Sequence, residues 1–292
     1  LMGAVVITGG ATGIGLAIAE RFLENNWQAM IASRNMKRLV EMKGALVGKY
    51  GTDPIDCCAT DVADEESVKS LQKATHERFG TVDTVINNAG IVIKAFAHEM
   101  EAREGAIVNI TSVSGMFGDY GMTAYNASKA AVINMTRAMA LDYGKYGIRV
   151  NNVAPGPTDT SMFPQEMKSA FSKNSPLGRI VEPDEVAKVV FFMSTDDSSA
   201  ITGETILVTA GFEISTDALL GAYASGKAGL VGFIRRHGIS SLTLIVHLEM
   251  INTAMNGAPI RNQMAQLQVS SRRSLQAVRK SQVASLHCQR VR

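Results

Sequence analysis

The chain has 292 residues, 46% of them hydrophobic, and its 29 Lys and Arg nearly balance its 27 Asp and Glu. This length holds one large domain, or one domain with an appendage, and the composition is ordinary for a soluble α/β protein. No apolar run reaches the roughly 18 residues of a membrane-spanning helix, so we expect no membrane span. The five His and three Cys show no metal-ligand spacing, so we expect no metal site.

Apolar strand-like runs alternate with longer helical patterns from residue 1 to about 214. The expected strands are 4–8, 27–32, 55–59, 82–87, 106–111, 147–153 and 205–209. The expected helices are 13–25, 35–49, 64–79, 93–104, 123–144 and 183–194. Several strands are apolar over most of their length, which indicates burial on both faces. The pattern predicts an α/β fold with a doubly wound parallel β-sheet (a Rossmann fold), helices on both faces, and a ligand at the carboxyl ends of the strands.

A glycine-rich turn, Thr-Gly-Gly-Ala-Thr-Gly-Ile-Gly, occupies residues 8–15 between the first strand and the first helix. Glycines let a backbone turn tightly and approach a pyrophosphate, which then lies at the helix N-terminus. No Gly-Lys-Ser/Thr follows, which disfavours a nucleoside-triphosphate loop. The residues expected to meet a dinucleotide here are Gly9, Thr12, Gly13, Ile14 and Gly15.

The second strand runs into Ser33, Arg34 and Asn35, which we expect to border the ribose of the dinucleotide. A site for NAD(H) usually carries an acid here, because a carboxylate binds the ribose hydroxyls. No acid is present, and the planar guanidinium of Arg34 suits a phosphate. The sequence therefore favours NADP(H); a solvated arginine on a turn is the alternative.

The third and fourth strands end in residues that also suit a cofactor site. Asp61 and Val62 follow the third strand, where a carboxylate can accept a hydrogen bond from an adenine amino group or simply cap a helix. The fourth strand ends in a small, polar turn that contains Asn88, Ala89 and Gly90. We expect these five residues to border the cofactor.

Ser112, Tyr125 and Lys129 form the candidate catalytic set. Tyr125 and Lys129 are four residues apart and share one helix face, and Ser112 follows the fifth strand. Carbonyl reduction needs a proton donor at the oxygen as hydride reaches the carbon. An adjacent ammonium favours the phenolate form of a tyrosine, and a serine hydroxyl can hold the carbonyl oxygen.

Together these motifs resemble those of the short-chain dehydrogenase/reductase family, over nearly all of residues 1–214. The matching segments are the glycine turn 8–15, Asn-Asn-Ala-Gly at 87–90, Ser112 with Tyr125 and Lys129, Pro-Gly at 155–156, and 201–211. The resemblance implies that Tyr125 is the acid/base, that Ser112 orients the substrate, and that Lys129 holds the nicotinamide ribose. It also places Pro155, Gly156, Thr158 and Thr160 at the cofactor, the two threonines by its carboxamide.

The chain departs from the family pattern after residue 90. Gly90 and Ser112 are only 22 positions apart, about half of the spacing usual in the family. The absent stretch would carry the family's fourth catalytic residue, an asparagine, and no residue here matches it. An apolar face formed by Ile93, Phe96 and Met100 could still close a short crossover between parallel strands. The alternative is that the sequence omits a stretch at this point.

Two further regions carry expectations. Residues 157–181 form a long Pro-, Ser- and Met-rich excursion at the carboxyl edge, where we expect a substrate lid or a plain surface loop. Residues 215–292 form an atypical basic extension, because no acid follows Glu249. Within it, the sequence of residues 222–228 is similar to that of residues 124–130, either as a remnant of duplication or by chance.

The leading functional hypothesis is an NADP(H)-dependent oxidoreductase that interconverts a carbonyl and a secondary alcohol on a small-molecule substrate. The alternatives are a non-catalytic NADP(H)-binding or scaffold protein and an enoyl-thioester reductase. The chain is expected to be cytoplasmic, with idle thiols and no N-terminal leader, and to form a homo-oligomer. A role of the basic extension in binding nucleic acid or an anionic membrane is a third, disfavoured hypothesis.

Overall fold

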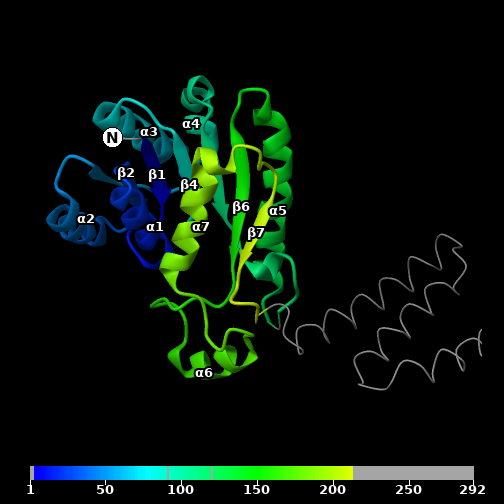
Figure 1. Ribbon diagram of the computed structural model, residues 1–292. Coiled ribbons are helices and arrows are strands. Elements are labelled where there is room, and N and C mark those ends of the chain that lie inside the picture. The colour runs from blue at the N-terminus through cyan, green and yellow to red at the C-terminus, as the bar shows by residue number, and fades with distance from the viewer. Residues whose placement is uncertain (1–2, 91, 120, 213–292) are drawn as a thin grey trace, which may run out of the picture. The chain divides into compact units, whose positions relative to one another are not determined.

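The computed structural model describes residues 3–90, 92–119 and 121–212, and the statements below concern these residues. Seven parallel strands form one sheet in the order β3-β2-β1-β4-β5-β6-β7 (Figure 1). Their bounds are β1 Ala4–Thr8, β2 Gln28–Ser33, β3 Ile55–Ala59, β4 Thr84–Asn87, β5 Ala106–Ile110, β6 Arg149–Pro155 and β7 Thr205–Val208. The predicted doubly wound parallel sheet is confirmed. The predicted extension 215–292, with the segment 222–228 that is similar to 124–130, lies outside the described residues.

Seven α-helices accompany the sheet in the described ranges. They are α1 Gly13–Glu24, α2 Met36–Tyr50, α3 Glu65–Phe79, α4 Ile93–Met100, α5 Thr123–Gly144, α6 Gln165–Asn174 and α7 Pro183–Ser194. Local sequence explains several of their ends. Asn35 and Asp64 accept hydrogen bonds from the first turns of α2 and α3, and Pro183 opens α7 behind a capping box of Glu182 and Glu185.

Two apolar cores lie on opposite faces of the sheet. One contains Phe22 of α1 and Val190 of α7, and the other contains Leu71 of α3 and Phe96 of α4. Successive residues of β1 alternate between the two cores, because side chains of a strand point to opposite faces in turn. This double burial explains why the central strands read as continuous apolar runs.

The order of strands reverses beside β1, which has β2 on one side and β4 on the other. The connections that leave β1 and β4 therefore diverge at their carboxyl ends. In open α/β sheets a crevice forms at such a switch point, and ligands bind there. The glycine turn follows β1 and residues 88–90 follow β4, so both motifs lie at this crevice.

The shortened connection between β4 and β5 closes with a helix of only eight residues, α4, and the short 3-10 turn Glu101–Arg103. Phe96 and Met100 are fully buried in the core beneath it. A Cβ on Gly105 would lie 2.7 Å from Met100 Cε and 2.8 Å from the Asp83 carbonyl oxygen, so the turn into β5 needs a residue without a side chain. Two turns of helix are enough to cover the sheet at this point.

The segment 157–181, expected as a substrate lid or a plain surface loop, contains helix α6 below the carboxyl ends of the strands (Figure 1). Phe171 of α6 stacks on Phe212 with ring centroids 5.2 Å apart and meets Phe163 edge-on at 5.6 Å. Ser175 Oγ donates a 2.6 Å hydrogen bond to the Ala210 carbonyl oxygen. These contacts attach α6 to the chain that follows β7.

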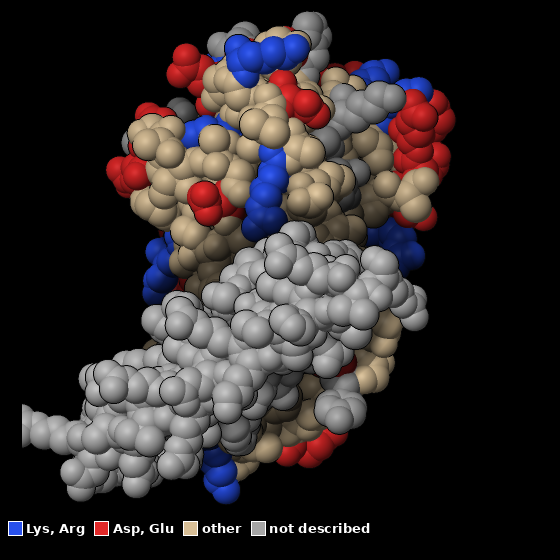
Figure 2. Space-filling model, turned by 90° about the vertical axis from the view of Figure 1, so that its right-hand side faces the viewer, with Lys and Arg blue, Asp and Glu red and all other residues tan. Residues whose placement is uncertain are grey.

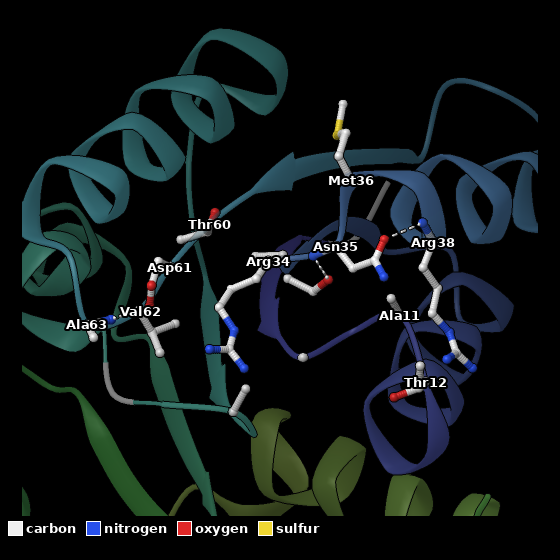
Figure 3. Close-up of a pocket in the computed structure, with 14 residues that line it drawn as sticks. Ala11, Thr12, Arg34, Asn35, Met36, Arg38, Thr60, Asp61, Val62 and Ala63 are labelled. Carbon is white, nitrogen blue, oxygen red and sulfur yellow. Dashed lines mark hydrogen bonds between the residues drawn. The ribbon is translucent and has the colours of Figure 1, made fainter.

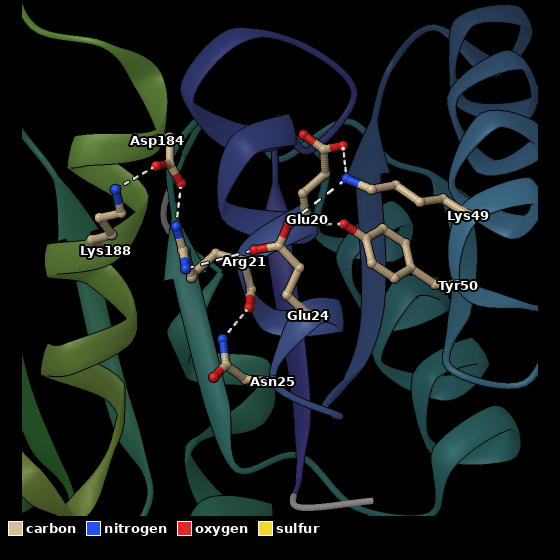
Figure 4. A network of polar contacts seen from close by, with 8 residues as sticks. All are labelled: Glu20, Arg21, Glu24, Asn25, Lys49, Tyr50, Asp184 and Lys188. Atoms are coloured by element: carbon tan, nitrogen blue, oxygen red, sulfur yellow. Dashed lines mark hydrogen bonds and ion pairs between the residues drawn. The ribbon is translucent and has the colours of Figure 1, made fainter.

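Polar contacts link α1, α2 and α7 on the outer surface of their layer (Figure 4). Arg21 of α1 pairs with Asp184 of α7 at 2.5 Å, and Lys49 of α2 pairs with Glu20 of α1 at 3.4 Å. The two hydrogen bonds of Asp184, to Lys188 and Arg21, lower the pKa of its carboxyl group. Exposed pairs of this kind each contribute about 0.2–1 kcal/mol, so they set the spacing of the helices more than the stability of the fold.

On the side of α5, basic and acidic side chains are interspersed over the described surface (Figure 2). Within the described ranges, no helix combines the length and the apolar character that crossing a membrane requires.

Candidate active site

The glycine turn and the segment after β4 are joined through Thr8, a fully buried residue at the end of β1. Thr8 Oγ1 accepts hydrogen bonds from the backbone N–H groups of Asn88 at 3.1 Å and Ala89 at 3.0 Å. Asn88 Nδ2 donates to the Gly9 carbonyl oxygen at 3.3 Å. Thr8 therefore holds the two sides of the crevice together.

Gly9, Gly10 and Gly15 are positions in this turn where a side chain has no space, and a Cβ on Gly10 would lie 2.9 Å from Ile31 Cβ. Gly9 has a φ of +69°, which disfavours any other residue. A Cβ on Gly15 would lie 2.2 Å from the Gly9 carbonyl oxygen. The start of α1 thus packs directly on the turn, and its free N–H groups lie where a phosphate can bind.

We expect Gly15→Ala to abolish nucleotide binding or to unfold the chain, because the clash involves two backbone segments that cannot move independently. Calorimetric titration with NADPH and thermal unfolding measure the two effects. Gly48→Ala is the matched control: it lies in α2, a Cβ at this position would have no atom within 4 Å, and the change should stabilise the protein by about 0.5–1 kcal/mol. Unchanged nucleotide affinity of Gly15→Ala would contradict this account of the turn.

A cavity of about 890 Å³ opens beside the glycine turn (Figure 3). Nine of its lining residues are sequence-predicted cofactor residues or belong to the same motifs: Gly9, Ala11, Thr12, Ser33, Arg34, Asn35, Asp61, Val62 and Ala89. Arg34 and Arg38 both line it. A cavity bordered by a glycine-rich turn and by two guanidinium groups suits a dinucleotide that carries phosphates.

The polar groups on this cavity are oriented by local turns. Asn35 Oδ1 accepts from the Arg38 N–H at 3.1 Å and so caps α2, and Ser33 Oγ accepts from the Asn35 N–H at 3.2 Å. Asp61 Oδ1 accepts from the Ala63 N–H at 3.0 Å. The cap of α3 is Asp64, so the interpretation of Asp61 as the cap of that helix is wrong.

A second, smaller cavity of about 210 Å³ brings the candidate catalytic residues together. Its lining contains Ser112, Tyr125 and Lys129 together with the predicted cofactor residues Ile14, Asn88, Pro155, Gly156, Thr158 and Thr160. The two cavities are neighbours along the chain: Ala89 lines the large one and Asn88 the small one, and the glycine turn contributes Thr12 to the first and Ile14 to the second. A ligand in the large cavity can therefore reach the phenol, the ammonium and the hydroxyl at the neighbouring one.

The three candidate catalytic side chains sit in different environments. Ser112 is buried and its Oγ accepts from the Ser114 N–H at 3.2 Å, whereas Tyr125 is 41% exposed at the mouth of the cavity. Lys129 Nζ donates to the Ile110 carbonyl oxygen at 3.0 Å and lies 5.7 Å from the centroid of the Tyr125 ring. Burial lowers the pKa of Lys129 below its usual value, because desolvation disfavours the ammonium.

Gly115 explains how a residue after β5 comes so near to α5. A Cβ on Gly115 would lie 2.7 Å from the backbone carbon of Lys129. The short 3-10 turn Val113–Gly115, which Ser112 caps, therefore packs against α5 at the level of Lys129. A side chain at position 115 would push Ser112 and Lys129 apart.

Some site residues were not predicted, and some predicted residues do not line a cavity. Sequence reasoning missed Ala32, Met36, Arg38, Thr60, Ala63, Ile110 and Thr111, which are neighbours of predicted strand ends and could have been found by extending each motif by a few residues. Gly13, Gly15 and Gly90 line neither cavity. A Cβ on Gly90 would lie 2.4 Å from Val62 Cγ2, so this glycine allows close packing of the turn.

Comparisons with known proteins identify the family of this chain. The family model for short chain dehydrogenases matches residues 3–104, and the model described as enoyl-(acyl carrier protein) reductase matches residues 91–213. Meso-2,3-butanediol dehydrogenase of Serratia marcescens is 35% identical over 71% of this chain and 93% of its own length. The NADP-dependent (R)-specific alcohol dehydrogenase of Lentilactobacillus kefiri is 32% identical over 71% and 95%.

A solved structure is also similar: an NADPH-bound short chain oxidoreductase of Pseudomonas aeruginosa PAO1 that contains an atypical catalytic center. The TM-score is 0.69 at 26% identity, and the match covers 72% of this chain and 96% of that one. The chain belongs to the short-chain dehydrogenase/reductase family. Its curated relatives above are oxidoreductases that act on small molecules.

Proposed function

We propose that this chain is an NADP(H)-dependent oxidoreductase that interconverts a carbonyl and a secondary alcohol. The observation that carries the proposal is the convergence of Ser112, Tyr125 and Lys129 on one small cavity beside the glycine turn. A phenol, an ammonium and a hydroxyl are the groups that proton transfer at a carbonyl oxygen requires.

NADP(H), when bound, would supply or accept the hydride, and the chain's own residues would manage the proton. Tyr125 donates its phenolic proton to the oxygen during reduction and takes it back during oxidation. The Ser112 hydroxyl donates a hydrogen bond to that oxygen and orients it. The Lys129 ammonium stabilises the phenolate electrostatically, and the Ile110 carbonyl fixes the position of its Nζ.

The preference for NADP(H) rests on the charges around the large cavity. Arg34 and Arg38 line it, and Asp61 is its one acidic lining residue among those described. Ser33 and Asn35, where a ribose-binding acid is usual for NAD(H), are uncharged. A guanidinium binds a phosphate through paired, charge-assisted hydrogen bonds, which NAD(H) cannot offer at this position.

The test is NADPH oxidation by the full chain across a panel of aldehydes and ketones, with identification of the products. Alcohols formed at the expense of NADPH support the proposal. NADPH binding by calorimetry without turnover of any carbonyl would instead support a non-catalytic nucleotide-binding or scaffold role.

An enoyl-thioester reductase is the second candidate, and the family model that matches residues 91–213 favours it. The panel should therefore contain an enoyl thioester beside the 3-oxoacyl thioester of equal length. Reduction of the carbon–carbon double bond, with the ketone left intact, would replace the proposed activity with this one.

A further inference from the structure

A row of hydrogen-bonded polar side chains crosses four neighbouring strands of the sheet. Asn87 on β4, Asn109 on β5, Asn152 on β6 and Thr205 on β7 are partners of one another in the strand register. The three asparagines are at most 4% exposed. Two residues earlier on the same face, β4, β5 and β6 carry Val85, Ile107 and Val150, which belong to the core under α3, α4 and α5.

Hydrogen bonds join this row, and one helix residue completes it. Asn87 Nδ2 donates to Asn109 Oδ1 at 2.8 Å, and Asn109 Nδ2 donates to Thr136 Oγ1 at 2.7 Å. Thr136 Oγ1 donates to Asn152 Oδ1 at 2.8 Å, and Asn152 Nδ2 donates to Thr205 Oγ1 at 3.1 Å. Thr136, which is fully buried, is the member that belongs to α5.

The direction of the chain of hydrogen bonds is fixed at one end. The backbone N–H of Val92 can only donate, and it does so to Asn87 Oδ1 at 3.1 Å. Each amide then accepts on one side and donates on the other. The Val132 carbonyl oxygen, 2.9 Å away, is a second acceptor for the Thr136 hydroxyl, but only donation to Asn152 pairs that buried amide oxygen.

Thr136 lies on the same face of α5 as the candidate catalytic residues. It follows Lys129 by seven residues and Tyr125 by eleven, which are close to two and three helical turns. The buried side chains of α5 are Ile133, Thr136, Met139 and Ala140, all from its middle onward. The part that carries Tyr125 and Lys129 contributes no buried side chain, so the buried contacts from residue 133 onward act together with the 3-10 turn Val113–Gly115 to set its position.

We propose that the Thr136 hydroxyl is a positioning group that sets the axial position of α5 against β5 and β6, and through it the position of Tyr125 and Lys129. The inference rests on the proposed function, since it assigns these two residues the proton transfer. The Thr136 hydroxyl must accept from the amide of Asn109 and donate to the amide of Asn152. Only one position of α5 along its axis allows both hydrogen bonds. Apolar contacts alone are non-directional and permit several.

Thr136→Val removes the hydroxyl at nearly constant volume and leaves Asn109 Nδ2 and Asn152 Oδ1 unpaired. We expect kcat to fall at least about tenfold with the KM for NADPH within about twofold, because proton transfer depends on the placement of α5 and the large cavity does not contain it. Thr136→Ser keeps the hydroxyl and should restore most of kcat. Thr136→Cys, a weaker hydrogen-bonding variant, serves if the valine variant does not fold.

Thr205→Val is the matched control, because it removes the other hydroxyl of the row from β7 and leaves α5 attached. It should lower the thermal stability and leave kcat unchanged. Equal kcat values for Thr136→Val and the wild type, or equal losses for Thr136→Val and Thr136→Ser, would overturn the positioning role. If Thr205→Val lowered kcat as much as Thr136→Val does, the row would act on the stability of the fold and not on the position of α5.

A second readout does not depend on turnover. Hydrogen exchange of the backbone N–H groups of α5 reports how firmly the helix is held against the sheet. Thr136→Val should speed exchange in the part of α5 that carries Tyr125 and Lys129, and Thr136→Ser should return it to the wild-type rate. Faster exchange in a chain without carbonyl turnover would support the positioning role and reject the proposed function. Unchanged exchange beside normal wild-type turnover would do the reverse.

Discussion

Replacement of Tyr125 by Phe should lower kcat for carbonyl reduction by about 10²–10⁴-fold, the contribution expected of a general acid. The variant keeps the aromatic ring that borders the small cavity and loses only the group that can donate a proton. The affinity for NADPH should stay within about twofold, because the large cavity does not include this residue. Steady-state NADPH oxidation and calorimetric titration measure the two quantities separately.

Tyr146→Phe is the control for this substitution. Tyr146 lies just beyond α5, is 38% exposed, and lines neither cavity of the candidate site, so its loss of a hydroxyl should leave kcat unchanged. If Tyr125→Phe keeps more than half of the wild-type rate, the phenol is not the proton donor. The proposed role of Tyr125 would then be wrong, even if the protein binds NADPH.

Arg34→Ala should weaken NADPH binding by about 10–150-fold and leave NADH binding nearly unchanged. A hydrogen bond to a charged group contributes about 1.5–3 kcal/mol, and each 1.4 kcal/mol is a factor of ten in affinity. The loss should shrink at high salt, because the interaction is between charges at an open cavity. Calorimetric titration with both cofactors at two ionic strengths tests this.

Lys37→Ala provides a matched loss of charge on the same surface, since Lys37 is exposed in the first turn of α2 and does not line the large cavity. Its effect on NADPH affinity should be less than about twofold, as expected for an exposed charge. Equal losses for NADPH and NADH in Arg34→Ala would mean that this guanidinium does not select the 2′-phosphate. The cofactor assignment would then need revision independently of the reaction.

The sheet could be predicted from sequence because its strands are buried on both faces. Runs such as residues 4–7 are apolar and are followed by turn motifs, so both the existence of the strands and their order in the chain could be predicted. The strand ends then located Gly9, Ser112 and the other motif residues, because parallel strands bring their carboxyl ends to one edge.

Helix α6 could not be predicted in the same way. It buries no residue, and the Pro-, Ser- and Met-rich composition of residues 157–181 is typical of a loop or a lid. Thr136 was also missed, because a lone threonine within a helix has no pattern of its own. Its proposed role follows from hydrogen bonds to Asn109 on β5 and Asn152 on β6, which lie side by side only in the folded sheet.

The short α4 crossover also bears on the order in which the sheet assembles. Asn87 and Asn109 pair across β4 and β5 at a separation of only 22 residues, whereas Asn88 reaches Gly9 across 79. Closing a shorter loop costs less chain entropy, and local contacts form faster than distant ones. We therefore expect β4 and β5 to associate early in folding, as should β1 and β2, whose partners Ala4 and Gln28 are 24 residues apart. The docking of β1 on β4 is then the slower, rate-limiting event.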